Sequence, residues 1–325
     1  MLLAGDIGGT KTLLGLFERG EPRPQPLHVD EFITLDHDGL ESILTTFLEK
    51  HGVRVSELEA SSFGVAGAIT DQVAQLTNVP WRIDAGEMMR HGFRRVRLLN
   101  DLEAMAYAIP VLAADELAIL QEGVKISSGN VAVIAAGTGL GEGMLLNIGG
   151  RLVPGQSEGG HADFAARTDK EFELVRMLRD RHGRAEVEQV LSGPGLLNIH
   201  RLTHRGGECE MVEGVPEADA PARVTQAGLT GRCQGCSEAL RMFVAAYGAE
   251  AGNLALRGVA TAGLFIGGGI APKIIAALKT GLFMDAFLDK APLHELLERV
   301  PVNVILNPAA GLLGAAVYAQ ESARP

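Results

Sequence analysis

The clearest signal of architecture is Leu2-Leu-Ala-Gly-Asp-Ile-Gly-Gly-Thr-Lys-Thr-Leu-Leu-Gly-Leu-Phe17, an apolar run, a glycine-rich turn with hydroxyls and a second apolar run. The same layout returns in Val131-Ala-Val-Ile-Ala-Ala-Gly-Thr-Gly-Leu-Gly-Glu-Gly-Met-Leu-Leu146. Each stretch predicts two strands joined by a tight turn whose backbone N–H groups can surround an anion. Two such hairpins predict two related half-molecules that hold a nucleotide between them, and this points to phosphoryl transfer.

Length and composition predict an acidic globular protein. A chain of 325 residues with 46% hydrophobic content can bury a large core, and we expect two domains. The first strand begins at once, which leaves no room for a signal peptide, and no apolar run is long enough to span a membrane. Three cysteines make no disulfide framework, which is typical of the cytoplasm. The formal charge of −11 argues against nucleic acid and anionic membrane as partners.

The first third of the chain alternates strand and helix patterns, which predicts an α/β fold with a mostly parallel sheet. Apolar residues at helical spacing between Leu40 and Leu48 predict a helix. Strands are predicted over 61–67 and 96–100, followed by a helix over 102–109. We place a small domain at residues 1–110, completed by the C-terminal segment 301–325, and a large domain at 111–300.

The rest of the chain is more helical. The strongest signal there is the apolar run of residues 237–258, which predicts a helix buried at the centre of the second domain. A strand, a triple-glycine turn and a helix start are predicted over 262–272. Further predictions are helices over 170–182, 193–202 and 309–319, a strand over 302–306 and a loop over 205–222.

The glycine turns are the candidate nucleotide site, because glycine lets the backbone approach a phosphate where a Cβ would clash. A hard cation prefers carboxylate oxygen, so Asp6 is the candidate Mg²⁺ residue, acting through water or the ATP phosphates. The chain has no Walker-type loop, and each turn taken alone is also consistent with a simple hairpin. The candidate cofactor residues are Asp6, Ile7, Gly8, Gly9, Thr10, Lys11, Gly137, Thr138, Gly139, Gly267, Gly268 and Gly269. Lys11 is consistent with either a phosphate contact or a solvent-facing position.

This layout resembles the sugar kinases of the actin-like ATPase superfamily, whose two duplicated domains hold ATP in the cleft between them. It is similar, more narrowly, to the bacterial glucokinase family, which is distinct from the ROK group of kinases and repressors. The stretches that carry this likeness run in the family's order over nearly the whole chain. They are Leu99-Asn-Asp-Leu-Glu-Ala104, Glu158-Gly-Gly-His-Ala-Asp-Phe164, Glu188-Gln-Val-Leu-Ser-Gly-Pro-Gly195, Phe265-Ile-Gly-Gly-Gly-Ile-Ala-Pro272 and Asn307-Pro-Ala-Ala-Gly-Leu-Leu-Gly314.

The resemblance implies an ATP- and Mg²⁺-dependent enzyme, usually a homodimer, that phosphorylates the 6-hydroxyl of glucose. It implies a sugar-contacting set of Asn100, Asp101, Glu158, His161 and Glu188. Asp101 is the expected general base, because phosphoryl transfer has a loose transition state and tolerates a weak base.

Each of these residues also has a purely structural interpretation. Asn100 with Glu103 fits a helix capping box, which by itself explains the Asn100-Asp101 pair. His161 is also consistent with an ordinary histidine or a metal ligand. Glu158 and Glu188 are also consistent with solvated surface charges. The alternatives for the whole chain are a kinase for another hexose or an N-acetylhexosamine, and a sugar sensor without turnover.

The Cys233-Gln-Gly-Cys236 stretch has the spacing of a zinc or redox motif. A single pair lacks the other two ligands, and Cys209 stands far away in the sequence, in the predicted loop. The kinases of the ROK group carry a denser cysteine-rich zinc motif. We therefore interpret Cys233 and Cys236 as structural thiols at a helix start.

Overall fold

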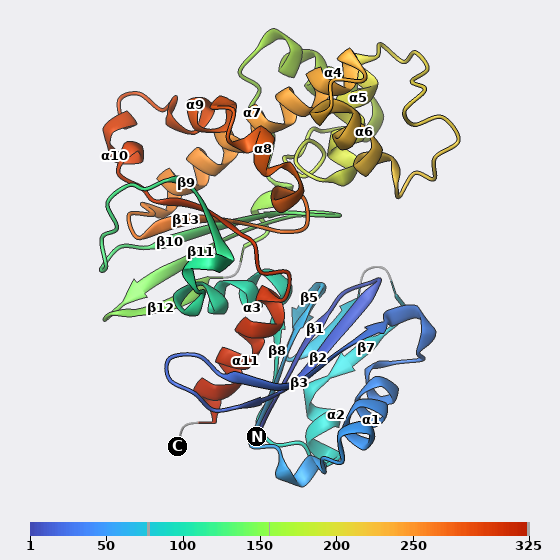
Figure 1. The fold of residues 1–325 in the computed structure, drawn as a ribbon, viewed down its shortest axis with the longest axis vertical. Coiled ribbons are helices and arrows are strands. Elements are labelled where there is room, and N and C mark those ends of the chain that lie inside the picture. Colours follow the sequence, from blue (N-terminus) through green and yellow to red (C-terminus); the bar gives the residue numbers. More distant parts are fainter. Residues whose placement is uncertain (77–78, 156, 324–325) are drawn as a thin grey trace. The chain divides into compact units, whose positions relative to one another are not determined.

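A computed structural model of the protein describes residues 1–76, 79–155 and 157–323. The chain forms two compact units, of which the first combines Met1–Glu116 with Asn307–Pro325 and the second is Leu117–Leu306 (Figure 1). The divisions fall at 116/117 and 306/307, six residues later in each case than the expected 110/111 and 300/301.

The first unit is built on a mixed sheet of order β3-β2-β1-β4-β8. The predicted hairpin is confirmed: β1 (Leu2–Ile7) and β2 (Lys11–Glu18) pair antiparallel, with Leu2 opposite Phe17 and Ile7 opposite Thr12. β3 (Gln25–Ile33) adds antiparallel to β2. β4 (Ala60–Val65) and β8 (Val96–Asn100) continue the sheet parallel to β1. The carboxyl ends of β1, β4 and β8 therefore meet at one edge, where the candidate residues lie.

Helices cover both sides of this sheet, as its apolar patterning requires. α1 (Leu40–His51) buries the predicted apolar face, including Ile43 and Phe47, in the same core as Leu3 and Phe63. α11 (Ala310–Ser322) comes from the end of the chain and packs on β1, β4 and α3 (Asp101–Ala108) (Figure 1). Small residues on α11 allow this close approach: a Cβ at Gly314 would overlap the carbonyl oxygen of Ala104.

The second unit has a sheet of order β12-β11-β10-β13-β14-β9. β10 (Val131–Ala136) and β11 (Leu140–Ile148) form the second predicted hairpin, and β12 (Arg151–Gly155) extends it antiparallel. β13 (Gly263–Gly267) and β14 (Val302–Ile305) run parallel to β10, and β9 (Leu117–Gln121) closes the edge antiparallel.

Five strands of the second unit repeat the order and direction of the five in the first, which confirms the predicted duplication. The expectation of mostly parallel sheets is wrong, because each hairpin and the strand after it enforce antiparallel pairing on one half of each sheet.

The buried centre of the second unit is α7 (Gln234–Gly258), which begins three residues before the predicted helix and buries Phe243 and Tyr247.

Two other predictions need correction. Residues 220–222 are not part of a loop but the first turn of an unpredicted helix, α6 (Ala220–Leu229), whose Pro221 suits a helix start. After the triple-glycine turn the chain forms a 3-10 turn over Ala271–Ile274 and only then the short α8 (Ile275–Leu278).

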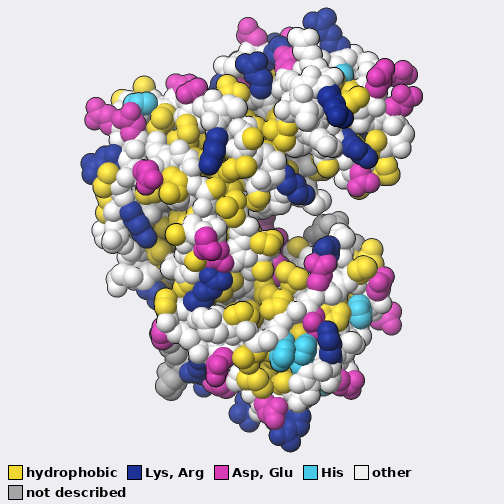
Figure 2. Space-filling model, in the orientation of Figure 1, with side chains coloured by type: hydrophobic (Ala, Val, Ile, Leu, Met, Phe, Trp, Pro, Cys, Tyr) yellow, Lys and Arg dark blue, Asp and Glu magenta, His cyan; other side chains and the backbone are white. Residues whose placement is uncertain are grey.

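The remaining elements pack around these cores. Among the described residues, no helix is long and apolar enough to cross a membrane. The remaining helices are α2 (Ala85–Arg90), α4 (Asp169–His182), α5 (Gly193–Thr203), α9 (Leu282–Leu288) and α10 (His294–Glu298). The remaining strands are β5 (Gly67–Thr70), β6 (Val73–Leu76) and β7 (Arg82–Asp84), which form a small antiparallel sheet. On the face shown in Figure 2, acidic and basic side chains are interspersed over both units.

Candidate active site

The first glycine turn is fixed by hydrogen bonds to the neighbouring backbone, and its residues 8–10 remain at least partly exposed. The N–H of Gly8 donates to the carbonyl of Lys11 (3.0 Å), which closes the turn between β1 and β2. Thr34 fastens it to the next segment, because its hydroxyl donates to the carbonyl of Gly8 (2.8 Å) and its N–H donates to that of Thr10 (3.0 Å). Ile7 is buried in the core, whereas Gly8 and Gly9 are partly exposed and Thr10 is exposed. The turn is therefore rigid and accessible, as an anion cradle must be.

Lys11 does not point its charge at this turn. Its ammonium pairs with the carboxylate of Glu31 on the neighbouring strand β3 (2.6 Å), and both side chains are exposed. Of its two expected positions, the structure favours the solvent-facing one.

Asp6 lies at the carboxyl end of β1, paired in register with Gly64 of β4. Burial raises the pKa of Asp6 to about 6, and the nearby charge of Asp101 adds to the shift. Close contacts explain two neighbouring glycines. A Cβ at Gly311, on the first turn of α11, would lie 2.7 Å from a carboxylate oxygen of Asp6, and one at Gly64 would lie 2.8 Å from the Cβ of Ala104. The same position at Gly64 is in ordinary contact with the Cα of Asp101, 3.8 Å away. The two aspartates thus share one edge of the sheet.

Asn100 and Asp101 form the junction between β8 and α3. The Asn100 side chain accepts the N–H of Leu102 (3.0 Å) as the N-cap, and a carboxylate oxygen of Asp101 accepts the same N–H (2.8 Å). Asn100 is therefore an N-cap, but its side chain bonds the N–H of Leu102, whereas the predicted capping box requires a bond to that of Glu103. Asp101 nevertheless remains exposed, so its carboxylate is accessible to a ligand at the sheet edge.

The second glycine turn is the counterpart of the first. The N–H of Gly137 donates to the carbonyl of Gly139 (2.8 Å), and the N–H of Gly193, at the start of α5, donates to the carbonyl of Gly137 (2.9 Å). Thr138 at its tip is exposed. Helix α5 thus supports this turn with its N-terminus.

The triple-glycine turn after β13 lies against the end of β10, directly before the second hairpin turn. Gly267 pairs in register with Ala135, and the N–H of Ile270 donates to the carbonyl of Ala136 (3.2 Å). Gly268 has φ +82°, and a Cβ there would lie 2.3 Å from the Ala136 carbonyl oxygen. Only glycine tolerates both the positive φ and the close approach at residue 268. The backbone of residues 267–269 therefore lies directly beside the end of β10, which leads into the 137–139 turn.

Glu158, His161 and Glu188 are brought together beside this surface. The N–H of Glu188 donates to the carbonyl of Gly160 (2.9 Å), and a Glu188 carboxylate oxygen accepts the N–H of Leu140 (2.8 Å). The intervening Gly160 is required because a Cβ would lie 2.2 Å from the Leu140 carbonyl oxygen. Glu188 is therefore not a simple surface charge: it joins the predicted sugar segment to the phosphate hairpin.

Sequence reasoning missed Glu186 and Arg184. Glu186 accepts a hydrogen bond from Nδ1 of His161 (2.8 Å), which raises the pKa of His161, and the charges of Glu188 and Glu158 add to the rise. Arg184 pairs with Glu186 (3.0 Å) and donates to the carbonyl of His161. Their sequence signal is only a charged pair just before Glu188, which is no stronger than that of a surface loop.

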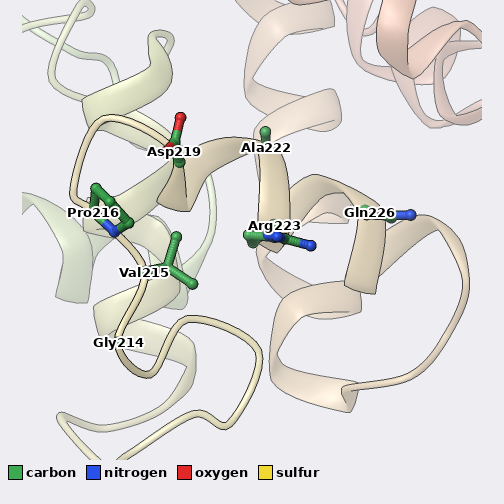
Figure 3. A pocket seen from close by; sticks show the side chains of 7 residues that line it. All are labelled: Gly214, Val215, Pro216, Asp219, Ala222, Arg223 and Gln226. Atoms are coloured by element: carbon green, nitrogen blue, oxygen red, sulfur yellow. The ribbon is translucent and has the colours of Figure 1, made fainter.

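The candidate residues thus fall into two sets, one at the carboxyl edge of each sheet. Neither set overlaps the surface pocket of Figure 3, which is lined by Gly214, Val215 and Pro216 of the 205–219 loop and by Asp219, Ala222, Arg223 and Gln226 at and after the start of α6.

The interpretation of the cysteines needs correction. Cys209 is distant from Cys233 and Cys236 in sequence, but its Sγ lies 3.9 Å and 3.8 Å from theirs, because the loop after α5 folds back onto the first turn of α7. The three thiols form one cluster and not a simple pair at a helix start.

Each of the two duplicated sheets thus carries a glycine hairpin beside acidic side chains at its carboxyl edge. The glucokinase family model matches residues 3–322. The chain belongs to the glucokinase family. It is 38% identical to the glucokinase of Nostoc punctiforme, covering 98% of both chains.

Solved structures agree with this fold. The glucokinase of an Antarctic psychrotroph matches with a TM-score of 0.87 and 28% identity, covering 98% of each chain. A ROK family glucokinase from Streptomyces griseus, in complex with glucose and AMPPNP, matches with a TM-score of 0.65 and 20% identity, covering 98% of each chain. At that identity the second likeness concerns the fold alone.

Proposed function

We propose that this protein transfers the γ-phosphoryl group of ATP to the 6-hydroxyl of glucose. Membership of the glucokinase family supports the reaction. The observation that carries the assignment of roles is the shared sheet edge in the first unit. There the exposed carboxylate of Asp101 lies near Asp6. The accessible Gly8–Thr10 turn begins two residues after Asp6 in the chain.

Asp101 acts as the general base of this proposal. Its exposed carboxylate orients the 6-hydroxyl and accepts its proton as the bond to phosphorus forms, while Asn100 contributes a further hydrogen-bonding group next to it. Glu158, His161 and Glu188 complete the sugar-binding set, because glucose presents only hydroxyls and is recognised by groups that donate and accept hydrogen bonds. His161 suits a donor role, since its raised pKa favours the protonated imidazole.

The nucleotide is assigned to the glycine turns. The N–H groups of Gly9, Thr10, Thr138 and Gly139 donate to phosphate oxygens, since those of Gly8 and Gly137 close their own turns, and Gly267–Gly269 gives a surface without side chains for the rest of ATP. Asp6 fits Mg²⁺, because burial and the nearby charge of Asp101 raise its pKa and a divalent cation would offset that cost. Mg²⁺ would supply charge neutralisation on the phosphates. Lys11 is left out of this set because it pairs with Glu31.

The test is a coupled assay of ADP formation with purified protein, Mg-ATP and a panel of glucose, mannose, fructose, galactose and N-acetylglucosamine. We expect glucose to give the highest kcat/KM, with glucose 6-phosphate as the product by mass spectrometry. A higher kcat/KM for another sugar would reassign the substrate. Binding of glucose without product from any sugar would indicate a sensor and overturn the enzymatic proposal.

We further propose a homodimer that works in the cytoplasm, where ATP is available. Exposed Leu27, Val29 and Ile33 along the edge strand β3 support self-association. Light scattering coupled to size-exclusion chromatography tests the oligomeric state: a mass of twice the 34.3 kDa chain is expected, and the mass of one chain would contradict it.

A further inference from the structure

Three separate parts of the second unit bring metal-ligating side chains to one place. His200 and His204 lie at the end of α5, Cys209 lies in the following loop, and Cys233 and Cys236 flank the first turn of α7. Donor atoms of His200, His204, Cys209 and Cys236 all lie within 4.8 Å of one another. Cys233 joins them through Cys209 (3.9 Å) and His204 (3.2 Å). We call these five residues the Cys/His cluster.

His204 is oriented as a metal ligand. Its Nδ1 donates to the backbone carbonyl of His200 (2.9 Å), which leaves the lone pair of Nε2 facing the sulfur of Cys233. A ligating histidine usually donates its other ring N–H to a carbonyl or carboxylate in this way. The ring is fixed from the other side too, since a Cβ at Gly235 would lie 2.5 Å from it.

Three of the six separations among Cys209, Cys233, Cys236 and His204 are close to the edges of a tetrahedral site. With Zn–S about 2.3 Å and Zn–N about 2.0 Å, the edges of a tetrahedron are about 3.8 Å between sulfurs and about 3.5 Å between sulfur and nitrogen. The observed separations are 3.9 Å and 3.8 Å between sulfurs and 3.2 Å between sulfur and nitrogen. They are far longer than a disulfide bond of about 2.05 Å.

His200 is the second histidine of the Cys/His cluster. It is buried, and its Nε2 has no hydrogen-bond partner among the described residues. Its ring packs against that of His204, with centroids 4.0 Å apart and the two planes inclined by 32°. We assign His200 to the packing that holds the His204 ring and not to the ligand set.

We propose that Cys209, Cys233, Cys236 and His204 bind one zinc ion. Three thiolates and one imidazole are a donor set typical of a closed structural zinc site, and their softness favours zinc over magnesium or calcium. The thiols lose their protons on binding, so metal uptake releases protons. The donors are distinct from Asp6 and from every residue assigned to ATP or glucose.

The expected role of the ion is to stabilise the second unit. It would join the C-terminal end of α5 to the start of α7 and fix Cys209 within the loop that lines the pocket of Figure 3. The opposite end of α5 carries Gly193, which supports Gly137 in the second glycine turn. A loss of zinc would therefore loosen the helix that positions this turn.

The first experiment measures zinc in the full-length protein, purified under reducing conditions from zinc-supplemented cells, by elemental mass spectrometry. We expect one zinc per chain, and loss of it in Cys209→Ser, Cys233→Ser and His204→Gln. His182→Gln, an exposed histidine at the end of α4, is the matched control and should retain zinc. His200→Gln should retain zinc as well. Loss in His200→Gln with retention in His204→Gln would overturn the assignment of the fourth ligand.

The second experiment does not depend on whether the variants fold. Cobalt(II) replaces zinc in the unmodified protein after chelation, and we expect thiolate-to-cobalt charge-transfer bands together with visible bands of tetrahedral cobalt. A zinc-free protein with three reduced thiols that gives no such bands would overturn the proposal. Peptide mass spectrometry that finds Cys209 in a disulfide in freshly purified protein would overturn it too. Neither readout uses the kinase reaction, so each result stands whatever the substrate is.

Discussion

A carboxylate oxygen of Glu188 lies 2.8 Å from the backbone nitrogen of Leu140, and the backbone N–H of the same residue donates to the carbonyl of Gly160, so that Glu188 joins the Gly159–Gly160 segment to the second glycine hairpin. A Cβ at Gly139 would lie 2.6 Å from the same carboxylate, which shows how closely the hairpin covers it. A change at Glu188 should therefore affect the sugar and the phosphate sides of the reaction together.

Glu188→Gln should lower kcat/KM for glucose by about 10- to 100-fold, because a hydrogen bond to a charged group contributes about 1.5–3 kcal/mol. We expect the KM for ATP to rise as well, since the hairpin loses its charged acceptor. Steady-state kinetics with each substrate varied in turn measures both effects. Glu173→Gln on the exposed face of α4 is the control. An unchanged KM for ATP would contradict the coupling.

Asp101→Asn should reduce kcat by about 10²- to 10⁴-fold, the usual contribution of a general base, while the fold is retained. The amide preserves the shape and the bond to the N–H of Leu102, whereas the proton acceptor and its negative charge are lost. Stopped assays for kcat and circular dichroism for the fold make the measurement. The exposed Asp180→Asn should keep full activity. Near-native turnover in Asp101→Asn would mean that another group accepts the proton.

Gly268→Ala should destabilise the protein by at least about 2 kcal/mol, because an alanine in a left-handed conformation costs about 1–2 kcal/mol and its Cβ here would also overlap a backbone oxygen. Gly269→Ala is the matched control, since no atom lies within 4 Å of a Cβ at Gly269. Urea unfolding of both variants compares the two neighbouring glycines. Equal midpoints would mean that the turn rearranges without cost.

Glu142→Gln should stabilise the protein at alkaline pH. Burial raises the pKa of Glu142 to about 7, the charge of Glu250 adds to the shift, and Arg257 opposes it. Neither carboxylate oxygen has a hydrogen-bond partner among the described residues. The unfolded chain loses this proton near pH 4.5 and the folded chain only near pH 7, so the folded state becomes progressively less favourable across that interval.

The stabilisation by Glu142→Gln should therefore be near zero at pH 4 and reach about 3 kcal/mol above pH 7, since each pKa unit corresponds to about 1.4 kcal/mol. Thermal unfolding at a series of pH values measures the difference. Glu173→Gln, which is exposed, should show no such dependence. A benefit that stays constant from pH 4 to pH 8 would contradict the assigned ionisation.

The parts of the fold that the sequence predicted are those encoded locally. The two hairpins follow from apolar runs on either side of a glycine-rich turn. Helices α1 and α7 follow from the spacing and length of their apolar runs. The share of parallel pairing was overestimated, because the third strand of each unit continues its hairpin antiparallel and so occupies one half of the sheet. Helix α6 was missed because its first residues, which include Pro221, continue the Gly-, Glu- and Pro-rich stretch of the preceding loop.

The same distinction holds for the site. The turn residues could be found because a glycine cradle is contiguous in sequence. The partnership of His161 with Glu186, and the approach of Cys209 to Cys233, join residues 24 or more positions apart that no local pattern links. Lys11 shows that neighbourhood in sequence can also mislead. It stands next to the first glycine turn in the chain, but its ammonium pairs with the carboxylate of Glu31 on the neighbouring strand.

The position of α11 affects how the chain matures on the ribosome. The second unit is continuous in sequence and can fold once residue 306 has left the exit tunnel, whereas one face of the first unit's sheet stays uncovered until residues 310–322 have been made. The first unit therefore has to wait for a helix that follows the whole of the second. Until that helix has been made, the faces of β1 and β4 that α11 will cover stay available to chaperones, and a product truncated before residue 307 would be a target for proteolysis.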